Sequence, residues 1–323
     1  MNRSQRFYGV AALLGMIVLI MDGKTAAAGA QAGVVLCLKV VIPSLFPFFV
    51  LSAVLMKSTG SDSIPGLSVP SRLFGLPKHL ESVLIPALLG GYPVGAQSVS
   101  RLFRDGALTK REAERMLAFC SNAGPAFLFG MVSQLFPNRW MVWALWGIHI
   151  LGAAMAARCL PAEHASDSEI RTGHSHGDIL RESVSVMGVV CGWIVLFRVV
   201  VAFLDRWFLW LLPSAARVAV IGLLELSNGC WALADVESIP MRFVLCSGLL
   251  AAGGVCVTMQ TASVTKGLSL RDYGLGKLVQ VLVSLSVSSC IAYRTALPLT
   301  VLLPLCFRKK AKKRGSNRML SGV

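Results

Sequence analysis

The stretch Leu223-Leu224-Glu225-Leu226-Ser227-Asn228-Gly229-Cys230 places a carboxylate and an amide inside apolar sequence, just before a glycine. An ionised carboxylate is costly in hydrocarbon, so such a residue usually faces a bundle interior or a water-filled cavity. Glycine tolerates backbone conformations that end a helix. The stretch therefore predicts a helix that is broken inside a membrane, with polar groups at the break.

The composition of the whole chain agrees with a membrane protein. Hydrophobic residues make up 55% of the 323 residues, charged residues only 15%, and the mean hydropathy is +0.67. A soluble domain has about 25% charged residues. At about 20 residues for each crossing, the chain has room for roughly eight spans or re-entrant pieces.

The net charge of +15 is concentrated at the chain ends and in short loops. Basic loops beside apolar spans are typical of cytoplasmic loops next to anionic lipid headgroups. A nucleic-acid partner would need a basic face on a soluble domain, and the sequence offers none. We expect the partner to be the lipid bilayer of the cell membrane, with the basic tail, 308–323, in the cytoplasm.

The fold class that we predict is all-α: a polytopic membrane protein of two similar halves with broken or re-entrant helices. Each half runs through an intact span, two broken segments and an intact span, an order that points to a transporter-like site. The predicted boundaries are a first half, 1–160, a hydrophilic linker, 161–182, and a second half, 183–307.

Two features of this scheme stay open in the sequence. The apolar run Phe7–Met21 is expected to be an uncleaved first span, with a cleaved signal peptide as the alternative. Whether the halves are inverted depends on Thr295–Phe307, which is thirteen residues with two prolines. Lys266, Arg271 and Lys277 are expected to form a basic turn before a last regular span.

The breaks are predicted at glycines and prolines inside uncharged segments. Irregular backbone at membrane depth persists only where it is buried in protein or lines a cavity. The predicted break residues are Gly90, Gly91, Pro93, Gly95, Gly124, Pro125, Gly229 and Gly254.

A solute site, if the chain has one, is expected at Glu225 and Asn228 together with Asn122 and Gln260 on the partner segments. Broken helices leave free N–H and C=O groups, and these side chains add directed donors and acceptors. The alternative is that the four side chains only satisfy backbone groups freed by the breaks.

Other chemistry finds little support in the sequence. There is no Gly-x-Ser-x-Gly elbow, no His-Glu-x-x-His and no phosphate-binding loop, so we expect neither an enzyme nor a cofactor. The nine cysteines form no Cys-x-x-Cys pair and are expected to be core residues. His174 and His176 in the linker could bind a divalent metal, but two histidines in a polar loop predict no metal site by themselves.

The basic segment Arg101–Arg115 contains Thr109-Lys110-Arg111-Glu112, which has the spacing of a capping box. A short interfacial helix is expected to begin there. We interpret it as a solvated loop helix, with a contact to lipid headgroups or to a partner as the alternative.

Several motifs together resemble the YlbJ-type sporulation integral membrane proteins. They are Pro43-Ser44-Leu45-Phe46-Pro47-Phe48-Phe49, Gly90-Gly91-Tyr92-Pro93-Val94-Gly95-Ala96, Glu112-Ala113-Glu114-Arg115, Cys120-Ser121-Asn122-Ala123-Gly124-Pro125-Ala126-Phe127, Leu224-Glu225-Leu226-Ser227-Asn228-Gly229 and the stretch 254–260. They occur in order and cover most of the chain. At Ser121 the family pattern has asparagine.

The resemblance implies the nucleoside-recognition or Gate domain, which is also similar to parts of nucleoside transporters and of a bacterial ferrous-iron transporter. It further implies a role in building the spore cortex. The function expected from it is recognition or movement of a small polar solute during cortex formation. A non-transporting scaffold for cortex assembly is the alternative, and the resemblance supplies no substrate, coupling ion or oligomeric state.

Overall fold

The computed structural model describes residues 3–59, 68–76, 80, 83–84, 86–160 and 179–295, and these residues form helices, turns and loops without a strand. The α-helices are α1 (Arg3–Met21), α2 (Gly23–Leu36), α3 (Ile42–Thr59), α4 (Ser68–Phe74), α5 (Val94–Arg104), α6 (Lys110–Cys120), α7 (Pro125–Gly130), α8 (Arg139–Cys159), α9 (Ile179–Trp207), α10 (Ser214–Leu224), α11 (Leu226–Ala232), α12 (Ile239–Ala252), α13 (Gly254–Val264) and α14 (Arg271–Tyr293). Two π-helical turns, η1 (Cys37–Val41) and η3 (Pro86–Gly90), and three 3₁₀ turns, η4 (Val132–Leu135), η5 (Leu209–Leu211) and η6 (Leu233–Asp235), complete the described elements.

Five helical stretches in the described part of the chain are long and apolar enough to cross a membrane. They are Gly23–Leu51, Arg139–Cys159, Ile179–Trp207, Ile239–Val264 and Arg271–Tyr293. The prediction of an all-α polytopic membrane protein is confirmed. The expected first span, Phe7–Met21, corresponds to α1, whose apolar part Gly9–Met21 is shorter than these five.

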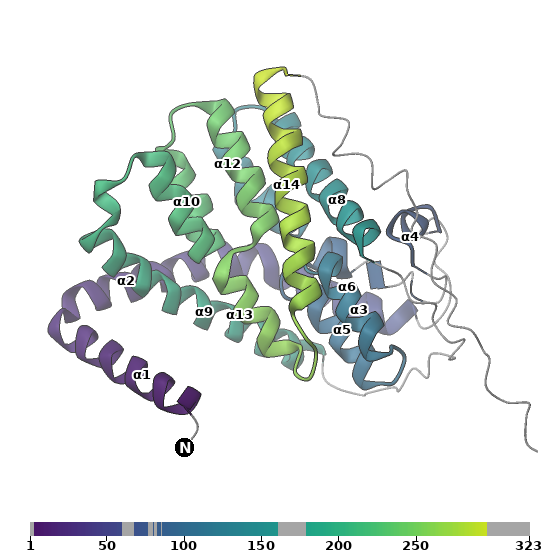
Figure 1. Cartoon of the computed structure of the whole chain (residues 1–323), viewed down its shortest axis with the longest axis horizontal. Coiled ribbons are helices and arrows are strands. Elements are labelled where there is room, and N and C mark those ends of the chain that lie inside the picture. The colour runs from purple at the N-terminus through teal and green to yellow at the C-terminus, as the bar shows by residue number, and fades with distance from the viewer. Residues whose placement is uncertain are drawn as a thin grey trace, which may run out of the picture.

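Helix α1 projects from the bundle and is apolar on nearly all sides (Figure 1). It ends where Asp22 caps α2: the Asp22 carboxylate accepts hydrogen bonds from the Thr25 N–H at 3.1 Å and the Thr25 hydroxyl at 2.7 Å. These hydrogen bonds hold the pKa of the Asp22 carboxyl below its usual range. Arg206 at the end of α9 lies 3.2 Å from the same carboxylate and connects this corner to the bundle.

Helices α2 and α9 lie side by side, because small residues let their backbones come close (Figure 1). Gly29 and Gly33 of α2 face α9 one turn apart. A Cβ at Gly33 would lie 2.9 Å from the Val195 Cα, and one at Gly29 would lie 3.0 Å from the Val199 Cα. No larger residue fits either position without moving the helices apart.

The same sequence of elements occurs twice. After α3 come the broken pairs η3–α5 and α6–α7 and then the intact α8; after α9 come the broken pairs α10–α11 and α12–α13 and then the intact α14. Helix α14 packs against α6, α8 and α12 and so joins the two series (Figure 1). The domain boundaries remain a prediction.

Parts of the predicted scheme lie outside the described residues. These are the linker up to residue 178, with His174 and His176, the segment after Thr295 and the tail 308–323. The last four linker residues are the first turn of α9.

The capping box of Thr109 and Glu112 is confirmed at the start of α6. From Ala113 onward this helix is buried, which differs from the solvated helix expected there. Arg115 donates hydrogen bonds to the carbonyl oxygens of Ala157 at 2.9 Å and Phe74 at 3.4 Å. Arg111 pairs with Asp272 of α14 at 3.0 Å. The second part of the basic segment therefore belongs to the bundle, because Arg115 caps the ends of α4 and α8 and Arg111 pairs with α14.

Candidate functional site

The break that the sequence placed near Gly229 lies at Glu225. Its backbone is extended, and α11 begins at the next residue. The Glu225 carboxylate accepts the backbone N–H groups of Ser227 at 3.0 Å and Asn228 at 2.6 Å, and the Asn228 side-chain amide at 2.7 Å. Glu225 is thus the N-cap of α11, a position where a side-chain oxygen replaces the missing helical acceptor.

Gly229, predicted as a break residue, lies within α11. Its role is close packing, since a Cβ there would overlap the Gly222 Cα of α10. In the other broken helix of this half, Gly253 and Gly254 have φ angles of +71° and +79°, which favour glycine. A Cβ at Gly254 would lie 2.8 Å from the Gly222 carbonyl oxygen. The two broken helices of the second half therefore meet at Gly222.

The breaks of the first half also meet at glycines. Gly91 has a φ of +74°, and a Cβ there would lie 3.0 Å from the Gly124 nitrogen. A Cβ at Gly95 would overlap the Cys120 carbonyl oxygen. The remaining predicted break residues flank these crossings: Gly90 ends η3, Pro93 precedes α5 after a cis peptide bond, and Pro125 begins α7.

Three side chains from intact spans satisfy the backbone that the first-half break frees. The Ala123 N–H donates to the His149 Nε2 of α8 at 2.9 Å. The Ser121 carbonyl accepts from the Lys277 Nζ of α14 at 2.7 Å, and the Ala118 carbonyl accepts from the Gln280 side chain at 2.8 Å. All three side chains are buried.

Lys277 was expected in a basic turn, but it lies in the second turn of α14 and is only 7% exposed. It also donates to the Tyr92 hydroxyl at 2.8 Å, and that hydroxyl donates to the Leu250 carbonyl at 3.1 Å. Lys277 and Tyr92 thus connect the first-half break to α12. In the sequence, Lys277 and Gln280 lie three apart on one face of α14, a spacing that indicates a polar pair but does not assign its partners.

A small cavity lies where the four breaks approach one another. The centres of water molecules can occupy about 40 Å³ of it, so the cavity has room for a few waters. Helices α3 and α9 close it on one side. Its lining residues are Val41, Leu45, Gly91, Tyr92, Ala123, Gly124, Phe127, Val190, Ile194, Glu225, Leu226, Ser227, Val257 and Gln260.

Of the four predicted site residues, Glu225 and Gln260 line this cavity, while Asn228 and Asn122 lie beside it. Gln260 donates to the Cys256 sulfur at 3.3 Å. The Asn122 amide donates to the Phe119 carbonyl, and its Oδ1 is buried without a hydrogen-bond partner. Within the described residues no group of three or more His, Cys, Asp or Glu could hold a metal, and none of the eight cysteines there forms a disulfide.

A comparison with curated proteins finds the sporulation integral membrane protein YlbJ of Bacillus subtilis (strain 168). The two chains are 25% identical over an alignment of 299 residues, and the match covers 77% of this chain and 73% of YlbJ. This chain is related to YlbJ. The resemblance inferred from the motifs is thereby confirmed. No family model matches the chain, and no solved structure matches it.

Five of the six motifs that resemble the YlbJ-type proteins contribute residues to the cavity, and the motif Glu112-Ala113-Glu114-Arg115 does not. Leu45 comes from the first motif, Tyr92 from the second, Phe127 from the fourth and Glu225 from the fifth. Segments as far apart in the chain as residues 45 and 225 therefore share one site. The relationship to YlbJ and the five spans make this chain a multi-pass membrane protein.

Proposed function

We propose that this protein acts in sporulation, without enzymatic activity, by recognising or moving a small polar solute at the cavity between the four breaks. The observation that carries the proposal is the position of Glu225: a carboxylate that is 2% exposed lines a cavity inside an apolar bundle. The relative YlbJ supports the link to sporulation. A contribution to spore cortex formation follows from the motif resemblance.

The chemistry of the site suits hydrogen bonding to a solute. A carboxylate accepts up to about four hydrogen bonds, and three donors already reach Glu225. The remaining capacity, and the amide of Gln260 on the opposite broken helix, are available to a solute. Glu225 would carry charge or a proton there. A nucleoside is larger than a few waters, so the cavity would have to widen to bind one.

A scaffold that assists cortex assembly is the second candidate, and one observation favours it. The polar site residues have partners in their own helices: Glu225 caps α11, Asn122 donates to Phe119, and Gln260 donates to Cys256. Polar groups of this kind can serve only to complete the hydrogen bonding of broken helices.

Complementation of a sporulating strain that lacks this protein separates the two candidates. The variants are Glu225→Gln, which keeps the size of the side chain and removes its charge, and Glu225→Asp, which keeps a carboxylate able to cap a helix. Glu237→Gln is the matched control, because Glu237 is exposed between η6 and α12. Cortex formation and membrane abundance are scored together.

Solute recognition predicts a cortex defect for Glu225→Gln at normal abundance, a weaker defect for Glu225→Asp, and none for Glu237→Gln. A solute screen that starts with nucleosides would follow. Normal cortex with Glu225→Gln would reject the site. A defect that follows only the loss of protein would support the scaffold.

A further inference from the structure

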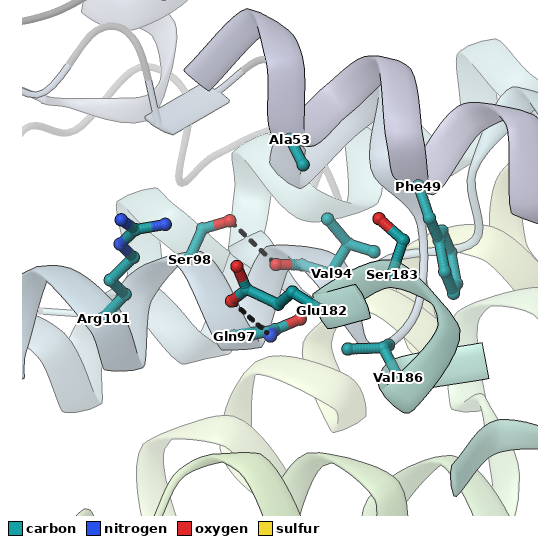
Figure 2. Close-up of a pocket in the computed structure, with 9 residues that line it drawn as sticks. All are labelled: Phe49, Ala53, Val94, Gln97, Ser98, Arg101, Glu182, Ser183 and Val186. Carbon is teal, nitrogen blue, oxygen red and sulfur yellow. Dashed lines mark hydrogen bonds between the residues drawn. The ribbon is translucent and has the colours of Figure 1, made fainter. Parts of the chain in front are cut away.

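A second pocket lies between α3, α5 and the first turns of α9 (Figure 2). Its volume is about 40 Å³ for the centres of water molecules, the same as that of the central cavity. Polar side chains lie in its middle, where the Gln97 amide donates to the Glu182 carboxylate at 3.3 Å. Arg101 lies at one end of the pocket, and Phe49 and Val186 lie at the other (Figure 2).

The two cavities are lined by different residues of the same helices, α3 and α9, and lie one after the other along them. On α3, Leu45 lines the central cavity and Phe49 lines the second pocket; on α9, Val190 and Val186 have the same relation. Four residues of an α-helix span about 6 Å, so each wall advances by one turn from one cavity to the next. The third wall runs from Tyr92, at the central cavity, to Val94 at the start of α5.

We infer that the second pocket is the outer chamber of the path into the central cavity, and that Phe49, Val94 and Val186 form the gate between them. All three are apolar, and Phe49 is only 3% exposed, so the layer closes the path to a polar solute. The identity of the molecule that follows this path, a solute, rests on the proposed function. The path and its gate are inferred from the two cavities alone.

The outer chamber selects the class of molecule that reaches the gate. Glu182 offers an acceptor, and Gln97 and Arg101 offer donors, so the chamber suits a small polar solute with both donors and acceptors. Arg101 also pairs with Asp105 at 3.9 Å and Arg104 follows it on α5. This concentration of basic residues places the mouth on the cytoplasmic side.

Residue-specific thiol labelling tests the path in the full chain. Ser98→Cys reports the outer chamber and Ser227→Cys reports the central cavity. A membrane-impermeant cationic methanethiosulfonate is added to intact cells, where it reaches the outer face, or to inverted membrane vesicles, where it reaches the cytoplasmic face. Peptide mass spectrometry locates each modified cysteine, so the native cysteines do not obscure the result.

The expected result is labelling of Ser98→Cys in inverted vesicles only, and slower labelling of Ser227→Cys from the same face. Phe49→Ala should speed the labelling of Ser227→Cys severalfold and leave that of Ser98→Cys unchanged. Phe136→Ala is the matched control, since it removes another buried ring that lines neither cavity. Val186→Ala replaces Phe49→Ala if that variant does not accumulate in the membrane.

The inference is overturned if Ser227→Cys is labelled only in intact cells, or if gate and control variants change its labelling equally. Labelling measures access and not activity. If Glu225→Gln supports a normal cortex while Phe49→Ala opens the cavity, the proposed function fails and the gate stands. If Glu225→Gln causes a cortex defect while Phe49→Ala leaves the labelling of Ser227→Cys unchanged, the gate is rejected and the proposed function stands.

Discussion

The two halves break their helices in the same order, but the α10–α11 break of the second half and the α6–α7 break of the first half satisfy their freed backbone in opposite ways. At the α10–α11 break of the second half one residue accepts the freed donors: the Glu225 carboxylate accepts the N–H groups of Ser227 and Asn228, the second and third residues of α11. In the first half the side chains come from other helices, His149 from α8 for the Ala123 N–H and Lys277 from α14 for the Ser121 carbonyl. One break is therefore stabilised locally and the other by tertiary contacts.

This difference has consequences for movement and for stability. A locally capped break keeps its hydrogen bonds when the surrounding helices shift, because its partners move with it. The first-half break loses partners if α14 or α8 moves away. We therefore expect the second-half break to be the part that can rearrange around a solute, while the first-half break holds the bundle together.

The largest effect on the amount of folded protein is expected from adding a side chain at Gly95, where the two breaks of the first half touch. Gly95→Ala would push a Cβ into the Cys120 carbonyl oxygen, which is backbone and cannot rotate away. We expect loss of folded protein from the membrane, measured as abundance and as the elution profile in detergent. Gly147→Ala in α8 is the control, because no atom lies within 4 Å of its Cβ position. Equal abundance of the two variants would show that the crossing is not tight.

A smaller effect is expected from replacing His149, the side chain of α8 that accepts the Ala123 N–H at the first-half break. His149→Leu would leave the buried Ala123 N–H without an acceptor, which costs about 1–3 kcal/mol of unfolding free energy. His149→Gln can supply an acceptor and should recover part of the loss. Thermal unfolding of the purified protein measures both. If His149→Leu were as stable as the parent, the first-half break would not depend on its long-range partners.

The smallest effect is expected from the local cap. Asn228→Ala removes one of the three hydrogen bonds to Glu225 and leaves the two from the backbone, so we expect a loss of about 0.5–1.5 kcal/mol or less. The same thermal unfolding experiment applies. A loss larger than that of His149→Leu would reverse the comparison between the halves.

The local and long-range solutions also explain how far the sequence could predict the site. Glu225 stood out because a carboxylate in apolar sequence is unusual whatever the fold, and its N-capping partners lie within three residues. The break was predicted four residues late, at Gly229, because glycine was taken as the breaking residue. Because the Glu225 side chain caps α11, no glycine is required at the break. Gly229 instead allows α11 to pack closely against α10.

Lys277 and His149 could not be predicted in their roles. Lys277 follows Arg271 closely enough to suggest a basic turn, and only the packing of α14 on α6 buries it. That packing depends on Gly276, where a Cβ would overlap the Ala118 carbonyl oxygen. Contacts between residues 118 and 276 depend on the tertiary fold and have no local pattern. The order of broken and intact elements, in contrast, follows from glycine, proline and apolar runs.

The π turn between α2 and α3 sets the angle between two faces of one long helix: the Gly29 and Gly33 face of α2, and the Leu45 and Phe49 face of α3. Its hydrogen bond from the Ile42 N–H to the Cys37 carbonyl encloses one residue more than an α turn does. Deleting one residue there would let the helix continue as a regular α-helix and turn α3 by about 100° relative to α2. The Gly29 and Gly33 face could still meet α9, but Leu45 and Phe49 would then point away from the two cavities. The length of this short segment is therefore as much a determinant of the path as the residues that line it.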